Sequence, residues 1–247
     1  MLSVLPVPIM DELVQRGVPT GANLLVEFDP RSLWYETSFT IAARALKSGT
    51  RVDYHTFIRA PNEVRNLLSR LGVDVDKLEQ DQTLRVVDSY TTQIGLNLSE
   101  EPRGSAKIET VAEKSLKLSD WSIGWVKELK EAPAEIDKKR LHIDDNSSVL
   151  LQYNDEKVII DVWRTRNLPH TRARESVFLY ALLTEVGSPS FQKQLESISD
   201  GIVEFKSEDK EGRIEQYVRV SAMRGRSYDS RWRRLQLLDN GEVKLVG

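Results

Sequence analysis

The amino-acid sequence predicts an α/β domain with a mostly parallel central sheet, helices flanking the sheet, and antiparallel strands added at the C-terminal end. Two observations support this fold class. Over most of the chain, short apolar runs alternate with amphipathic segments of helical period. In the last third, short strand-like runs are separated by the turn sequences Lys-Glu-Gly at 210–212 and Asp-Asn-Gly at 239–241.

The first half of the chain supplies signals for three strands and two helices. The strand at 24–28 follows a Gly-Val-Pro-Thr-Gly turn cluster, and the helix after it ends before a Ser-Gly stop. The next helix begins with a proline, which suits the first helical turn. The elements expected here are strands at 24–28, 51–56 and 84–88 and helices at 35–46 and 61–71.

The second half resumes the alternation after a polar, charged stretch. Residues 95–116 contain Pro102 and Gly104, and they are interpreted as an exposed linker or insertion inside one domain, 1–247. After it we expect a helix at 118–129, a strand at 140–144, a helix from about 156 and a strand at 177–186. Shorter strands are expected at 201–206, 213–223, 235–238 and 242–246.

Composition bounds the class of protein. The 247 residues include no cysteine, which excludes disulfides and thiolate metal sites. The three histidines, His55, His142 and His170, lie far apart in the sequence, so a histidine metal site is not expected. The net charge is −3, and there is no run of about 20 apolar residues. We therefore expect a cytoplasmic protein without a membrane partner.

Ligands of parallel α/β sheets bind at the carboxyl ends of the strands. This rule directs attention to the loop after Phe28, the region after Thr56 and the segment after Asp144. A phosphate-binding loop after the first strand would need glycines for backbone approach, a lysine for charge and a hydroxyl for Mg²⁺.

Several segments resemble KaiC-like ATPases of the RecA superfamily. The lead-in VPIMDELVQRGVPTGANLLVEFDP is similar to the opening of that family, where a strand is followed by Gly-Asp-Pro-Gly-Ser-Gly-Lys-Thr. EVRNLLSRLGVDVDKLEQDQTLRVVDSYT, RLHIDDNSSVLLQYND, LESISDGIVEF and RVSAMRGRSYDSRW resemble later parts of the family in the same order. The resemblance implies a RecA-like P-loop NTPase fold over nearly the whole chain.

Residue by residue, the resemblance implies that most of the nucleotide site has been replaced. Phe28 and Leu33 stand at the two glycine positions, Trp34 at the lysine and Tyr35 at the hydroxyl. The paired glutamates that activate water correspond to Ile58 and Arg59, and the subunit-bridging Lys-x-Arg corresponds to Ala222-Met223-Arg224. Asp144 is retained at the Walker B position beside Mg²⁺. The degenerate nucleotide site therefore comprises Asp29, Pro30, Arg31, Ser32, Leu33, Trp34, Tyr35 and Asp144.

Losing the glycines, lysine, hydroxyl and base together removes both positioning and charge stabilisation. The sequence thus predicts a protein that has lost ATP hydrolysis and acts as a regulatory, signalling or scaffold protein, as a homo-oligomer or beside a KaiC-like paralogue. One alternative is weak ATP binding at a rebuilt site, with Arg31 supplying charge and Asp144 holding Mg²⁺. Another is a purely structural role, in which Trp34 and Tyr35 pack over the strand ends.

Arginines interleaved with aromatic residues offer a further alternative, a nucleic-acid-binding module. The candidates for phosphate-backbone contact are Arg164, Arg166, Arg231, Arg233 and Arg234. Arg224 and Arg226 are candidates for a subunit interface or a phosphate contact. Solvated faces or interface ion pairs would explain the same residues.

Overall fold

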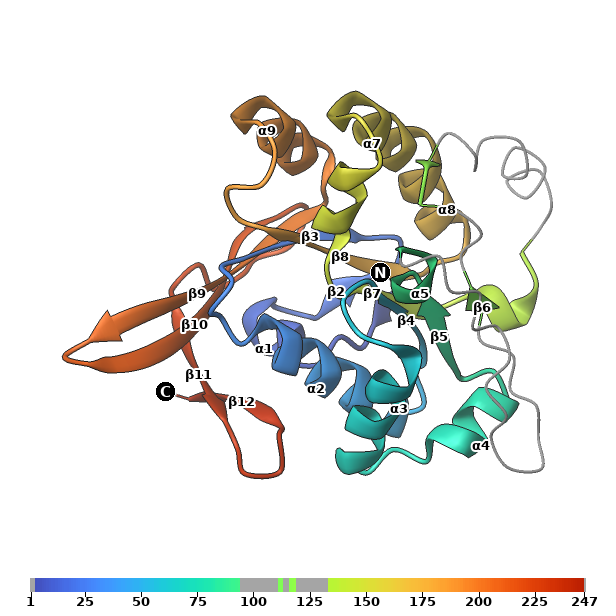
Figure 1. Ribbon diagram of the computed structural model, residues 1–247, viewed down its shortest axis with the longest axis horizontal. Coiled ribbons are helices and arrows are strands. Elements are labelled where there is room, and N and C mark those ends of the chain that lie inside the picture. The colour runs from blue at the N-terminus through green and yellow to red at the C-terminus, as the bar shows by residue number, and fades with distance from the viewer. Residues whose placement is uncertain (1–2, 94–110, 113–115, 119–132, 247) are drawn as a thin grey trace.

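The computed structural model describes residues 3–93, 111–112, 116–118 and 133–246. Its central element is a ten-stranded sheet of order β12-β11-β10-β9-β3-β8-β7-β4-β5-β6 (Figure 1). Pairing is parallel from β9 through β6 and antiparallel from β9 to β12. This is the RecA-like arrangement that the sequence predicted, including the antiparallel C-terminal strands.

The main sheet has these strands in chain order: β3 (Asn23–Phe28), β4 (Arg51–Thr56), β5 (Leu84–Asp88), β6 (Val111–Ala112), β7 (Arg140–Asp144), β8 (Val177–Leu183), β9 (Gly201–Lys210), β10 (Arg213–Met223), β11 (Arg233–Leu237) and β12 (Val243–Val246). β1 (Val4–Leu5) and β2 (Val18–Pro19) form a separate pair. The α-helices are α1 (Met10–Leu13), α2 (Trp34–Lys47), α3 (Pro61–Arg70), α4 (Val75–Gln80), α5 (Tyr90–Gln93), α7 (Glu156–Val162), α8 (Leu168–Ala173) and α9 (Pro189–Ile198). A π-helical turn, Trp163–Asn167, joins α7 to α8, and short 3₁₀ turns occur at Glu135–Asp137 and Ser147–Gln152.

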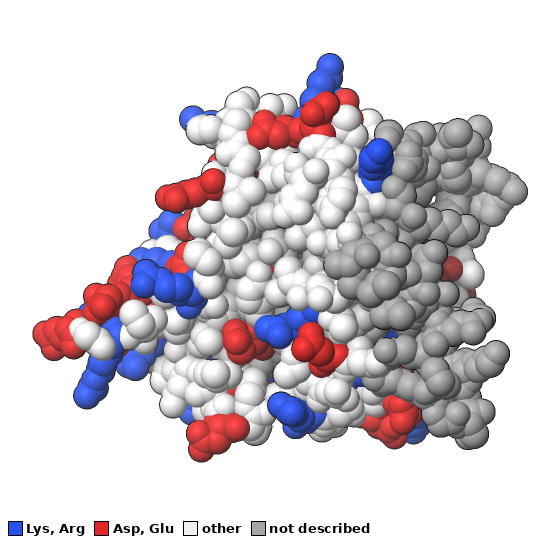
Figure 2. All heavy atoms as spheres, in the orientation of Figure 1, with Lys and Arg blue, Asp and Glu red and all other residues white. Residues whose placement is uncertain are grey.

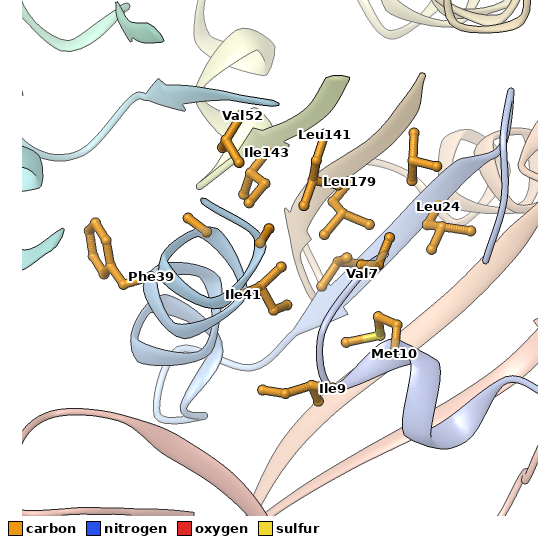
Figure 3. Packing of buried hydrophobic residues seen from close by; sticks show 14 of the residues in the cluster. Val7, Ile9, Met10, Leu24, Phe39, Ile41, Val52, Leu141, Ile143 and Leu179 are labelled. Carbon is orange, nitrogen blue, oxygen red and sulfur yellow. The ribbon is translucent and has the colours of Figure 1, made fainter. Parts of the chain in front are cut away.

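Helices cover both faces of the sheet. α1, α2 and α3 lie on one face, and α7, α8 and α9 lie on the other (Figure 1). On the α2 face, Figure 3 shows side chains of α2 and of the N-terminal segment directed toward β3, β4, β7 and β8. On the opposite face, Trp163, Tyr180 and Phe191 belong to a second apolar cluster. Burial on both faces explains why the adjacent strands β3 and β8 are nearly continuous apolar runs.

Most predicted elements are confirmed with small changes in their bounds. β4, β5, β7 and β10 have the predicted bounds. β8 ends at Leu183 because the next residues turn, with Glu185 and Gly187 both at positive φ. α9 was not predicted, although Ser188 caps it by accepting a hydrogen bond from the Phe191 N–H and Pro189 begins it.

β9 is longer than predicted because it continues to Lys210 through charged residues. It forms with β10 a long hairpin that projects beyond the rest of the sheet (Figure 1). The predicted linker 95–116 lies almost entirely outside the described residues, and so does the predicted helix 118–129. In the described part of the chain, no helix is long and apolar enough to cross a bilayer.

Candidate functional site

The loop at 29–33 joins β3 to α2 at the carboxyl end of the sheet. Asp29 organises it from its first position. The Asp29 carboxylate accepts hydrogen bonds from the Arg31 N–H (2.8 Å) and from the Ser207 hydroxyl (3.1 Å) and backbone N–H on β9. Ser32 completes the turn by donating its hydroxyl to the Asp29 carbonyl oxygen over 2.7 Å.

Gln216 of β10 closes the other side of the loop. Its Oε1 accepts a hydrogen bond from the Leu33 N–H over 3.1 Å, and its Nε2 donates to the Arg31 carbonyl oxygen over 3.1 Å. Leu33 is the residue at the second glycine position, whose N–H would face a phosphate in a P-loop. In this protein that N–H has a side-chain acceptor from the same chain.

Trp34, the first residue of α2, is completely buried. Its indole Nε1 donates a hydrogen bond to the Asp145 carbonyl oxygen over 2.8 Å. Its ring packs edge-on against Phe205 at 5.2 Å between centroids and tilted against Phe28 at 6.2 Å. Trp34, which the family resemblance aligns with the lysine, is therefore part of the core cluster on the α2 face.

Tyr35 lies beside Trp34 and is half-buried. Its ring contacts Phe28 edge-on at 5.4 Å, and its hydroxyl accepts a hydrogen bond from Asn146 Nδ2 over 3.2 Å. Burial, reinforced by the nearby Asp145 carboxyl, raises the pKa of the Tyr35 hydroxyl. Phe28 at the end of β3 thus contacts both Trp34 and Tyr35 at the start of α2.

Asp144 ends β7 and is buried. Its carboxylate accepts a hydrogen bond from the Ser147 hydroxyl over 2.9 Å and lies 3.5 Å from His55 Nδ1. His55 belongs to the neighbouring strand β4 and is paired with Asp144 in register. The predicted Mg²⁺ ligand is therefore in contact with Ser147 of the 3₁₀ turn that follows β7 and with His55 of the adjacent strand.

Asp145, the next residue, is also buried, and its carboxyl group contacts the end of β4. Its carboxyl group contacts the Phe57 N–H (2.8 Å) and the Thr56 hydroxyl (3.2 Å), both at the end of β4. Burial raises the pKa of Asp145 to about 7, against the lowering effect of these contacts and of Arg59. The sequence indicated only a turn at this acidic pair and gave no sign that Asp145 supports Trp34.

Ile58 and Arg59, at the positions of the water-activating glutamates, follow β4. Neither residue carries a carboxylate. The Arg59 carbonyl oxygen accepts a hydrogen bond from the Thr56 hydroxyl over 2.7 Å, and the Arg59 guanidinium lowers the pKa of Asp145 electrostatically. Arg59 therefore places a positive charge near Asp145 after the end of β4.

The three histidines, distant in sequence, lie in a row on the α8 face. The rings of His55 and His142 are 6.2 Å apart, and those of His142 and His170 are 6.4 Å apart. Burial lowers the pKa of all three, to about 4 for His55 and about 3 for His170. Within the described ranges, no group of three or more potential ligands could hold a metal ion.

Four of the five arginines proposed to contact nucleic acid have carboxylate partners nearby. Arg164 pairs with Asp161 at 2.6 Å, Arg231 and Arg233 pair with Asp229 at 2.9 and 3.7 Å, and Arg234 pairs with Glu215 at 3.6 Å. Arg166 lies close enough to His55 and His170 to lower their pKa values. Figure 2 shows mixed charges crowded on the projecting hairpin, not a surface of one sign.

Arg224 and Arg226 follow β10 and differ from each other. The Arg224 side chain is exposed and donates a hydrogen bond to the Ser197 carbonyl oxygen at the end of α9. In Arg226 the Nε and one terminal nitrogen are buried and have no hydrogen-bond acceptor among the described residues. Because a buried donor without an acceptor is costly, an acceptor supplied by a partner would stabilise the partly exposed Arg226 side chain.

The strand order and the helices on both faces of the sheet define a RecA-like α/β domain. The chain belongs to the KaiC family of ATPases, whose family model matches residues 6–244. The match covers the sheet, both layers of helices and the C-terminal strands.

Individual relatives cover nearly the same length at low identity. A UPF0273 protein of Pyrococcus furiosus is 22% identical over 238 residues, or 96% of this chain and 91% of the relative. A UPF0273 protein of Thermotoga maritima is 23% identical over 240 residues, or 96% of this chain and 93% of the relative. A UPF0273 protein of Aeropyrum pernix is 22% identical over 250 residues, with 96% and 90% covered.

Proposed function

We propose that this KaiC-family chain does not hydrolyse ATP efficiently and acts through protein contacts in a regulatory, signalling or scaffold role. The observation that carries the proposal is the placement of Trp34. It stands at the lysine position, is completely buried, and is hydrogen-bonded to the Asp145 carbonyl oxygen. A phosphate at this point would have to displace a core side chain.

Phosphoryl transfer depends on positioning and on neutralising charge at the phosphates. The backbone donors of the loop are already used: the Arg31 N–H by Asp29, and the Leu33 N–H by Gln216. Arg31 is the one cationic side chain within 29–35, and it is exposed. The loop therefore offers a triphosphate neither a cradle of N–H groups nor a buried cation.

The residues also do not fit a Mg²⁺ ion bound with nucleotide. Mg²⁺ in P-loop proteins is held by the loop hydroxyl and the Walker B aspartate. Tyr35 stands at the hydroxyl position, and its phenol accepts from Asn146. Asp144 remains, but its carboxylate contacts Ser147 and His55. No step of catalysis is therefore assigned to a metal or to ATP.

A role through protein contacts is supported by the retained scaffold. The core of both sheet faces is filled, and the β9–β10 hairpin projects away from it (Figure 1). The partner we propose is a second copy of this chain or a KaiC-like paralogue, with Arg224 and Arg226 at the contact. Light scattering of the purified chain, alone and mixed with a KaiC-like paralogue, tests this association. A chain that stays monomeric in both samples would contradict the proposal.

Nucleic-acid binding receives less support because the candidate arginines are paired with Asp161, Asp229 and Glu215. Such binding would weaken linearly in log affinity with log salt. A fluorescence anisotropy titration with single- and double-stranded DNA at low ionic strength decides it. Salt-dependent binding that is lost in an Arg231→Ala/Arg234→Ala variant would favour the nucleic-acid function.

Phosphate release from ATP with Mg²⁺ tests the catalytic part of the proposal. We expect no turnover above that of an Asp144→Ala variant prepared in the same way. Turnover in the wild type that disappears in Asp144→Ala would establish an ATPase with a rebuilt site.

A further inference from the structure

Two residues that face each other across the β9–β10 hairpin hold both sides of the loop. Ser207 and Gln216 are directly paired in the antiparallel register. Ser207 donates from its N–H and hydroxyl to Asp29, and Gln216 bridges the Leu33 N–H and the Arg31 carbonyl oxygen. We call this pair of residues the Ser207–Gln216 clamp.

The clamp lies on the side of the hairpin that faces α2. Side chains alternate between the two sides of a strand, so Gln216 shares its side with Val218 and Val220, both completely buried. Ile214 is on the same side one position further toward the turn, and it is 49% exposed. The clamp thus marks the point at which the hairpin leaves the core and becomes a projecting arm.

The clamp also connects to the start of α2. Leu33 is the residue that precedes the helix, and it has no side-chain cap. Phe205, two residues before Ser207, accepts the Asp29 N–H through its carbonyl oxygen and packs against Trp34. A displacement of the hairpin at Ser207 and Gln216 therefore acts on the hydrogen bonds that link the loop to β9 and β10.

We propose that the Ser207–Gln216 clamp is a conformational device through which movement of the projecting hairpin loosens or fixes the loop at 29–33. The inference rests on the proposed function, because it gives protein contacts a physical route to the loop. Ser207 and Gln216 act as positioning residues: they hold the loop through Asp29, Arg31 and Leu33.

Removal of one half of the clamp tests its hold on the loop. In Gln216→Ala, we expect hydrogen exchange at the Leu33 amide to accelerate about five- to tenfold, the effect of losing one hydrogen bond. Gln216→Glu keeps an acceptor for the Leu33 N–H and should restore most of the protection. Tyr217→Ala, one residue along and on the other side of the strand, is the matched control and should leave the loop unchanged.

A unique label tests whether hairpin movement reaches the loop. The chain has no cysteine, so a single introduced cysteine can carry a bulky polyethylene-glycol maleimide. A label at Ile214→Cys lies on the clamp side and should speed exchange in the 29–33 segment. The same label at Arg213→Cys, on the opposite side, should not.

The proposal would be overturned if hydrogen exchange in the 29–33 segment were equal in all labelled and unlabelled proteins. It would also be overturned if the Leu33 amide were as protected in Gln216→Ala as in the wild type. Global unfolding is excluded by following amides of β4 and β7, which should exchange equally in every variant. The readout uses no nucleotide, so an ATPase activity would refute the proposed function without affecting this result.

Discussion

The indole nitrogen of Trp34 donates a hydrogen bond to the backbone carbonyl oxygen of Asp145, 111 residues away, over 2.8 Å. This contact joins the start of α2 to the residue that follows β7. The resemblance to KaiC-like ATPases aligns Trp34 with the phosphate-binding lysine and Asp144, the neighbour of Asp145, with the Mg²⁺ ligand. Because both partners are buried, the bond belongs to the core of the domain. Substitution of Trp34 should accordingly lower the stability of the folded domain.

Trp34→Ala should lower the free energy of unfolding by about 3–5 kcal/mol, because it leaves a cavity in the core. Trp34→Phe keeps most of the volume but leaves the Asp145 carbonyl oxygen unpaired, at a cost of about 1–3 kcal/mol. Trp232, half-buried between Lys206 and Arg219, is the control, and its change to Ala should cost about 1 kcal/mol. Urea unfolding curves of the three variants would contradict this account if Trp34→Ala were as stable as Trp232→Ala.

The pH dependence of stability should reflect Asp145. Burial raises its pKa from 3.8 to about 7, so the folded state holds a proton that the unfolded state releases. The resulting stabilisation is complete below about pH 4 and is lost as the pH rises through about 7.

Asp145→Asn removes this titration. The wild type should lose stability relative to Asp145→Asn by on the order of 2 kcal/mol between about pH 5 and about pH 8. Contributions of the buried histidines cancel in this difference, because both proteins contain them. Parallel stability curves across that range would show that Asp145 is ionised throughout in the folded protein.

The ion pair of Arg140 and Asp53 should matter far more than those at the surface. Arg140 is 1% exposed, contacts Asp53 at 2.6 Å, and donates further hydrogen bonds to backbone carbonyls, those of Ile136 and Gln82 among them. Arg140→Ala leaves the buried carboxylate and these carbonyls without their donor, and should cost about 3–5 kcal/mol.

Arg44→Ala provides the comparison, since Arg44 pairs with Glu242 at 2.7 Å with both side chains about a third exposed. It should cost no more than about 1 kcal/mol. Urea unfolding measures both losses of stability. Equal decreases in the free energy of unfolding in Arg140→Ala and Arg44→Ala would contradict the expectation that the buried ion pair matters more than the exposed one.

The sequence predicted the fold well where local signals were strong. β4, β5 and β7 are short strands whose apolar residues are set among polar ones, and their ends match the prediction. β9 was placed too short because its outer residues are charged and its partner β10, not its composition, extends it. α9 was missed, although its Ser-Pro start was visible.

Within the candidate site, the sequence identified the residues of the loop and not the contacts that hold them. Ser207 and Gln216 lie 178 and 183 residues from the groups they bind, so no local pattern could link them to the loop. The histidine row is similar, because adjacent parallel strands bring together residues that are distant in the chain. Such contacts follow from strand order, which a single sequence specifies only indirectly.

The most direct test of the central claim is the melting temperature of the purified chain with and without millimolar ATP and Mg²⁺. A ligand that binds the folded state must raise the melting temperature. The size of the rise depends on the ratio of the ligand concentration to the dissociation constant. With Trp34 in the core and the loop donors occupied, we predict no shift. A rise in melting temperature that depends on ATP concentration and is lost in Asp144→Ala would contradict the account.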